Sequence, residues 1–117
     1  MTAGLEPEDA KIVTLARTAR TRGYPGPAEG AAARDDSGRT YAAATVRHED
    51  PSLTTSALRG ALSAAVSSGA RRFEAFALVA DDPSLSDGDR ALLRELARGV
   101  TVLLATPDGA VVATAEI

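Results

Sequence analysis

Side chains able to do chemistry are few and scattered in this sequence. The only histidine, His48, stands in the polar run Arg47-His48-Glu49-Asp50-Pro51, and the chain contains no cysteine. Disulfides, thiolate metal sites and thiol nucleophiles are therefore excluded. Because consecutive residues of a loop point in different directions, His48, Glu49 and Asp50 are expected to be solvated side chains. A hydrolytic or metal-binding cluster is the less favoured interpretation.

Two pairs of aspartates could bind a cation, and two serines could act as nucleophiles. Carboxylates of Asp81, Asp82, Asp87 and Asp89 are oxygen ligands of the kind that a hard cation such as Mg²⁺ takes. Acidic residues at the start of a helix, however, are stabilised by its macrodipole, and that explanation is favoured.

Ser56 and Ser86 could be nucleophiles only with a base at hand. Because the one histidine lies in an unrelated loop, we expect both serines to cap helices instead.

Bulk properties indicate one cytoplasmic domain spanning residues 1–117. Of the 117 residues, 44% are hydrophobic and 25% charged, which is typical of a globular protein. A formal net charge of −3, dispersed arginines and 3% aromatic residues argue against a nucleic-acid partner. No apolar run approaches the ~20 residues that span a membrane, and the acidic start is unlike a signal peptide.

Hydrophobic periodicity and turn residues predict eight elements. An apolar stripe of Ile12, Leu15, Ala16 and Ala19 marks a first helix that ends before Gly23. A second helix, capped by Thr54 or Thr55 and closed by Gly69, carries Leu58, Ala61, Leu62, Ala65 and Val66. A third, capped by Ser86 or Asp87, carries Leu92, Leu93 and Leu96. Strands are expected at Ala31–Arg34, Thr40–Val46, Phe73–Ala80, Val100–Ala105 and Val111–Ala115, with turns at Asp35–Gly38 and Thr106–Gly109. This order predicts an α/β fold, a three-layer α-β-α sandwich around a mixed five-stranded sheet.

The order and spacing of several motifs resemble the small zinc-dependent cytidine deaminases, from about Lys11 to Glu116. The family run Tyr-Ser-Gly/Asn-Phe-x-Val-Gly-Ala-Ala corresponds to 24–32, Tyr-Pro-Gly-Pro-Ala-Glu-Gly-Ala-Ala. The helix beginning Cys-Ala-Glu-Arg corresponds to Ser56-Ala57-Leu58-Arg59, and Cys-x-x-Cys-Arg-Gln corresponds to Ser86-Asp87-Gly88-Asp89-Arg90-Ala91. Both helices match in register without a gap.

The residues that carry the family's chemistry are the ones that differ. The resemblance places the zinc ligands at Ser56, Ser86 and Asp89, and the proton-shuttling glutamate at Leu58. Zinc of this type needs three thiolate or imidazole ligands, and serine hydroxyls are poor substitutes. Without zinc nothing lowers the pKa of water towards ~7. We therefore expect no metal, no cofactor and no catalytic residue, and treat these four positions as vestigial.

Nucleoside-holding positions differ as well. The resemblance places a ribose-gripping Asn-x-Glu at Thr45 and Arg47, the phenylalanine of the base pocket at Pro27, and the proline before the cysteine pair at Leu85. The expected function is a catalytically inert, cytidine deaminase-like pseudoenzyme, a binding or scaffolding protein. Family members of this length imply a homo-oligomer, a dimer or tetramer, and Ala57, Ala61, Ala64 and Ala65 of the second helix should allow close helix approach. The alternative is a binder of small, nucleoside-like ligands, or an enzyme of altered chemistry, that uses Asp89, Arg47 or Ser56 in the reshaped pocket.

Overall fold

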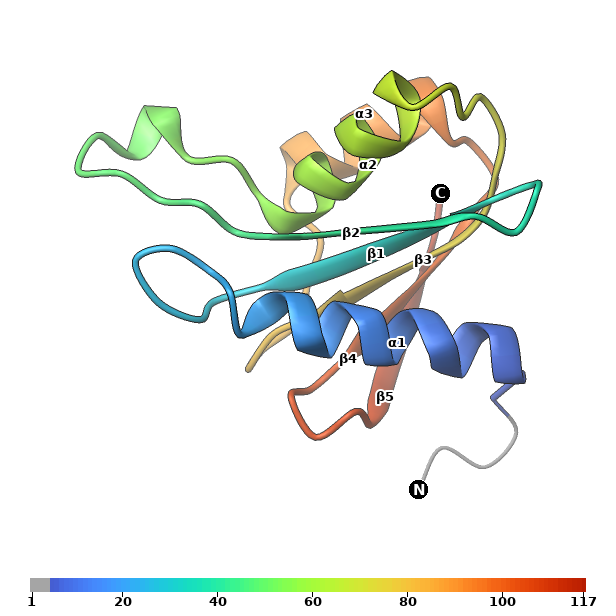
Figure 1. Cartoon of the computed structure of the whole chain (residues 1–117), viewed down its shortest axis with the longest axis horizontal. Coiled ribbons are helices and arrows are strands. Elements are labelled where there is room, and N and C mark those ends of the chain that lie inside the picture. The colour runs from blue at the N-terminus through green and yellow to red at the C-terminus, as the bar shows by residue number, and fades with distance from the viewer. Residues whose placement is uncertain (1–4) are drawn as a thin grey trace.

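The computed structural model describes residues 5–117, which form three α-helices, a short 3₁₀ helix and five strands (Figure 1). In chain order these are α1 (Pro7–Arg20), β1 (Gly30–Asp35), β2 (Thr40–Ala44), η1 (Pro51–Leu53), α2 (Ala57–Ser67), β3 (Phe73–Val79), α3 (Asp87–Leu96), β4 (Thr101–Ala105) and β5 (Val111–Glu116). The predicted order of helices and strands is confirmed.

The strands form one mixed sheet in the order β2-β1-β3-β4-β5. β1 pairs antiparallel with both β2 and β3, β4 pairs antiparallel with β5, and β3 and β4 run parallel. A parallel pair needs a long crossover connection, and α3 provides it between β3 and β4. The mixed five-stranded sheet predicted from the sequence is therefore confirmed.

Helices cover both faces of the sheet, α1 on one and α2 with α3 on the other (Figure 1). Successive side chains of β3 point to opposite faces of the sheet, as they do in any β-strand. Phe76 packs in the cluster with α2 and α3, whereas Ala77 packs in the cluster with α1. This arrangement is the predicted three-layer sandwich.

A glycine sets the distance between α1 and the sheet. A Cβ added to Gly30, the first residue of β1, would lie 2.0 Å from the backbone oxygen of Ala16 and 2.5 Å from the backbone nitrogen of Arg20. Only a residue without a Cβ allows the helix this close, since real Cβ atoms essentially never come within 3.0 Å of another heavy atom.

Three boundary or orientation predictions were wrong. Of the two expectations for the cap of α2, Ser56 is right and Thr54 or Thr55 is wrong, because the Ser56 hydroxyl accepts a hydrogen bond from the Arg59 N–H in the first turn. The buried positions Asp89 and Leu93 of α3, with Ala97 directly after the helix, recur at intervals of four. Leu96, which was expected on the apolar stripe of this helix, lies at the margin of that stripe and is 42% exposed.

The second strand is shorter than predicted, ending at Ala44. Beyond it, Val46 pairs with Tyr24 and Thr55 through isolated bridges. Among residues 5–117, no helix combines the length and apolar character that a membrane crossing needs.

Candidate functional site

Helices α2 and α3 begin with the same local device. The Ser56 Oγ accepts a hydrogen bond from the Arg59 N–H at 3.1 Å, and the Ser86 Oγ accepts one from the Asp89 N–H at 3.1 Å. Each hydroxyl thereby satisfies one of the N–H groups that the first turn of a helix leaves unpaired. Both serines are helix caps, as predicted.

The two helix N-termini are joined by a side-chain hydrogen bond. The Ser56 hydroxyl donates to the Asp89 Oδ1 at 2.8 Å, although the two residues belong to different helices. Asp89 is only 6% exposed. The fold thus brings together Ser56, Ser86 and Asp89, the three positions to which the family resemblance assigns zinc ligands.

Leu58 is the second residue of α2 and is fully buried. It belongs to the core cluster that contains Leu62, Phe76 and Leu93. Its position on the apolar stripe of α2 predicted that it points inward, and its burial confirms this. The position that the resemblance gives to a proton-shuttling glutamate is part of the apolar core.

A second carboxylate, that of Glu29, lies near Asp89. Glu29 is half-buried just before β1, and its Oε1 accepts a hydrogen bond from the buried Thr45 hydroxyl at 3.4 Å. Burial raises the pKa of Glu29, the negative charge of Asp89 raises it further, and the Thr45 hydrogen bond opposes both effects. Two acidic groups therefore share this end of the sheet.

Glu29 is the one site residue that the sequence reasoning missed. The signal was present, because Glu29 occupies the place of an apolar valine in the run that aligns with residues 24–32. A carboxylate directly before the buried Gly30-Ala31-Ala32 stretch is a charge at the margin of a core. A charged residue at such a position is unusual and therefore indicates a candidate site residue.

The donor set at the helix N-termini does not fit zinc. The Ser56 and Ser86 hydroxyls are neutral and already cap their helices. The Asp89 Oδ1 already accepts a hydrogen bond from the Ser56 hydroxyl. A zinc site of the hydrolytic type needs three strong donors, usually imidazole or thiolate, and one open position. Within residues 5–117, no three His, Asp or Glu side chains gather closely enough to hold a metal ion.

Several other candidates lie apart from this cluster. Arg47, His48 and Glu49 are exposed and line a separate surface pocket with Tyr24 and Pro25. The expectation that this polar loop is solvated is confirmed. The idea that Arg47 shares a pocket with Asp89 and Ser56 finds no support in the pocket's lining.

Asp81 and Asp82 also lie outside the cluster and are exposed. Asp81 forms an ion pair with Arg20 at 3.2 Å. Asp87 lies with Asp89 in the first turn of α3, where the helix macrodipole favours acidic residues.

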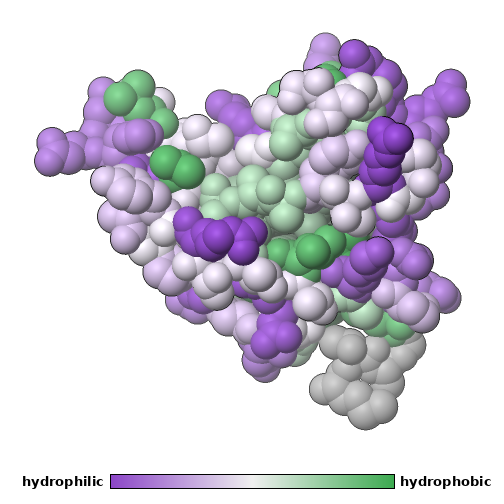
Figure 2. Space-filling view, viewed as in Figure 1, coloured by the Kyte–Doolittle hydropathy of each residue, from purple (hydrophilic) through white to green (hydrophobic). Residues whose placement is uncertain are grey.

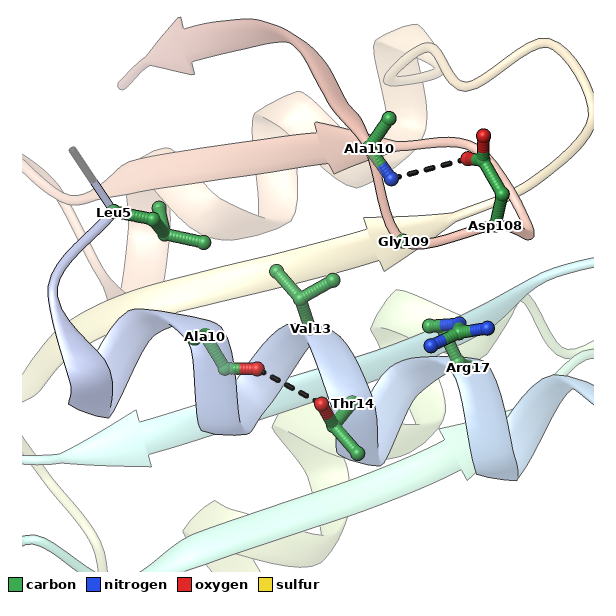
Figure 3. A pocket seen from close by; sticks show the side chains of 8 residues that line it. All are labelled: Leu5, Ala10, Val13, Thr14, Arg17, Asp108, Gly109 and Ala110. Atoms are coloured by element: carbon green, nitrogen blue, oxygen red, sulfur yellow. Dashed lines mark hydrogen bonds between the residues drawn. The ribbon is translucent and has the colours of Figure 1, made fainter. Parts of the chain in front are cut away.

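Another pocket, of about 250 Å³, separates α1 from the turn between β4 and β5 (Figure 3). Leu5 and Val13 line its apolar part. Its polar groups are already paired, since the Arg17 Nε donates to the Pro107 carbonyl at 2.9 Å and the Asp108 Oδ1 accepts from the Ala110 N–H at 3.1 Å. These contacts hold the turn on the helix and leave little to recognise a ligand.

Comparisons with known proteins agree with the geometry. The family model described as cytidine deaminase-like matches residues 5–109. The structure is similar to a cytidine deaminase from Burkholderia pseudomallei, with a TM-score of 0.82 and 25% identity over 91% of this chain and 90% of that chain. A cytidine deaminase from Mycobacterium tuberculosis gives a TM-score of 0.72 and 26% identity over 80% of each chain.

A cytidine deaminase from Mycobacterium leprae shares the fold, with a TM-score of 0.75 and 22% identity over 91% of this chain and 90% of that chain. No curated protein sequence matches this chain significantly. The family model spans most of the chain and the solved deaminases share its sheet and helices. The chain therefore belongs to the cytidine deaminase-like family.

Proposed function

We propose that this chain is a catalytically inert member of its family, a pseudoenzyme that acts as an oligomeric binding or scaffolding protein. The observation that carries the proposal is the 2.8 Å hydrogen bond between the Ser56 Oγ and the Asp89 Oδ1. It occupies two of the three positions that the family pattern gives to zinc ligands. Such a pair links the N-termini of two helices and leaves one carboxylate where a zinc site needs three strong donors.

Leu58 supports the same proposal. General acid–base assistance of the kind a glutamate gives is worth roughly 10²–10⁴-fold in rate, and a buried leucine gives none. The burial of Leu58 also favours the scaffold over the alternative, a protein that binds a small ligand in the reshaped pocket. The side chain fills core space beside Leu62, and four surface pockets of residues 5–117 are lined by other residues.

The direct test combines metal content with activity. Purified protein should contain far less than one zinc per chain by elemental mass spectrometry, and cytidine should not be converted to uridine. The matched control is a variant with the family's zinc ligands restored, Ser56→Cys, Ser86→Cys and Asp89→Cys, which should take up zinc. Stoichiometric zinc in the wild type, together with uridine formation that Asp89→Asn abolishes, would contradict the proposal.

Self-association through α2 can use only part of the alanine set that the sequence suggested. Of the four alanines expected to allow close helix approach, Ala57, Ala61 and Ala65 are fully buried, whereas Ala64 is exposed. The exposed side of α2 instead presents Ser63, Ala64 and Ser67. Light scattering should report a dimer or tetramer of the 12.0 kDa chain. A monomer at all concentrations would refute the oligomeric part of the proposal and leave the inert site untouched.

A further inference from the structure

A groove rich in arginine lies at the other end of α2 from the Ser56–Asp89 bond. It runs between the β1–β2 turn and the connection from α2 to β3, which Figure 1 shows next to each other. The Asp36 N–H donates to the Arg72 carbonyl at 3.1 Å and ties the two segments together. The groove has a volume of about 460 Å³, and Arg39, Arg71 and Arg72 line it.

These three guanidinium groups form no ion pair with the rest of the described chain. Within residues 5–117, the arginines in salt bridges are Arg20 and Arg34. All three groove arginines are exposed. Guanidinium groups gathered in one groove repel one another, and an anion from outside relieves that repulsion.

Asp35, which also lines the groove, forms no ion pair with these arginines, and its oxygens accept hydrogen bonds from the β1–β2 turn instead. The Oδ1 accepts the Ser37 hydroxyl at 2.6 Å, the Ser37 N–H at 2.9 Å and the Arg39 N–H at 3.0 Å. The Oδ2 accepts the Tyr41 hydroxyl at 2.9 Å. The Ser37 hydroxyl bond is the main reason that the pKa of Asp35 is lowered. This carboxylate shapes the turn and turns its charge inward, where it is 4% exposed.

Arg71 is held in place before any ligand arrives. Its Nη1 donates to the Val66 carbonyl at 2.9 Å and to the Ala70 carbonyl at 2.8 Å. These bonds take up carbonyl groups at the end of α2 that would otherwise face the groove with partial negative charge. A guanidinium fixed in advance loses less conformational entropy on binding, and its remaining N–H groups keep the forked geometry that suits phosphate.

From this arrangement we propose that the groove binds a phosphate-bearing small molecule through Arg39, Arg71 and Arg72. Charge-assisted and bidentate hydrogen bonds from arginine match phosphate oxygens. The volume lies within the ~300–1,000 Å³ usual for small-molecule sites. Asp36 is the one exposed carboxylate that lines the groove, and it weakens the binding. The chain carries a formal net charge of −3, so the basic character is local to this groove.

The test is a titration of the full chain with inorganic pyrophosphate, followed by calorimetry and by backbone amide NMR shifts. Binding should be saturable, and the largest shifts should fall on residues 36–39 and 68–72. Arg39→Gln and Arg72→Gln should each weaken it about tenfold, the loss expected for one charge-assisted contact. Asp36→Asn should strengthen it several-fold. Arg71 is left unchanged, because its bonds also hold the end of α2.

Arg98→Gln is the matched control, an exposed arginine outside the groove whose replacement removes the same charge. It should leave the affinity unchanged. Equal weakening by Arg98→Gln, or the same shifts with sodium chloride at matched ionic strength, would overturn the proposal in favour of general screening. Tight binding of single-stranded DNA without binding of pyrophosphate would overturn it in favour of a nucleic-acid surface. The outcome is independent of zinc content and deaminase activity, so it can fail while the inert-site proposal stands.

Discussion

Gly60 of α2 lies so close to Ala43 of β2 that a Cβ added at position 60 would come within 2.9 Å of the Ala43 Cβ. Gly60→Ala should therefore destabilise the protein by about 1 kcal/mol, because overpacking outweighs the better helix propensity of alanine. Gly88→Ala in α3 is the control. Nothing lies within 4 Å of a Cβ added there, and this change should stabilise by up to about 1 kcal/mol. Urea unfolding of both variants measures the difference, and equal effects would show that α2 moves freely over β2.

Leu58→Glu, which restores the family residue, should destabilise the fold by roughly 3–5 kcal/mol. The buried leucine contributes ~1.5–3 kcal/mol, and a polar group left unpaired in the core costs ~1–3 kcal/mol more. Leu58→Met, which keeps the volume, should cost less than about 1.5 kcal/mol. An unchanged or raised melting temperature for Leu58→Glu would mean that position 58 borders an open cleft. The ligand-binding alternative would then be preferred to the scaffold.

Glu29 should reduce stability at neutral pH. Its folded pKa is raised above the ordinary 4.5, so the folded state binds its proton more tightly than the unfolded state does. The stability this gives is complete below pH 4.5 and is lost as pH rises through the folded pKa. Glu29→Gln should thus raise the melting temperature at pH 7, with a smaller gain as pH falls towards 4.5.

The same substitution at the exposed Glu95 removes an equal charge and serves as the control. Asp89→Asn should lower the pKa of Glu29, because it removes the neighbouring negative charge. Carboxyl NMR titration of Glu29 in the wild type and in this variant measures that change. Identical titration curves would show that the two carboxylates do not interact.

The pKa of Asp35 is shifted in the opposite direction from that of Glu29, so its effect on stability has the opposite dependence on pH. Its pKa is lowered below the ordinary 3.8, so its hydrogen bonds stabilise the fold above that pH and the stability is lost as pH falls through the folded pKa. Asp35→Asn should be clearly less stable than the wild type at pH 7, and the difference should shrink below pH 3.8. Asp36→Asn, at an exposed position of the same turn, should show little change in thermal melts across this range. A constant deficit of Asp35→Asn down to pH 2 would contradict the assignment.

Local patterns were sufficient to predict most of the secondary structure. Gly69 was expected to end α2, and its φ of +107° is the left-handed conformation that a glycine adopts after a helix. The apolar run of β3, interrupted by Glu74 alone, predicted a strand buried on both faces, and residues 75–79 are buried. These features depend on neighbours in sequence, so they can be read without the fold.

Motif spacing also singled out Ser56 and Ser86, and each of them caps its own helix. What the sequence could not provide was distance between segments far apart in the chain. The Ser56–Asp89 bond, the charge of Asp89 felt by Glu29, and the burial of Ala57, Ala61 and Ala65 all depend on how α2 and α3 pack on the sheet.

In the arginine groove, too, some features depend on neighbours in sequence and others on how distant segments pack. The sequence predicted a turn at Asp35–Gly38 and the end of a helix at Gly69, and both are present. It contained no sign that Arg39 would face Arg71 and Arg72, because the β1–β2 turn and the α2–β3 connection meet only through the pairing of β1 with β3. Local propensities thus determined which elements form. Long-range strand pairing and helix packing determined which side chains meet.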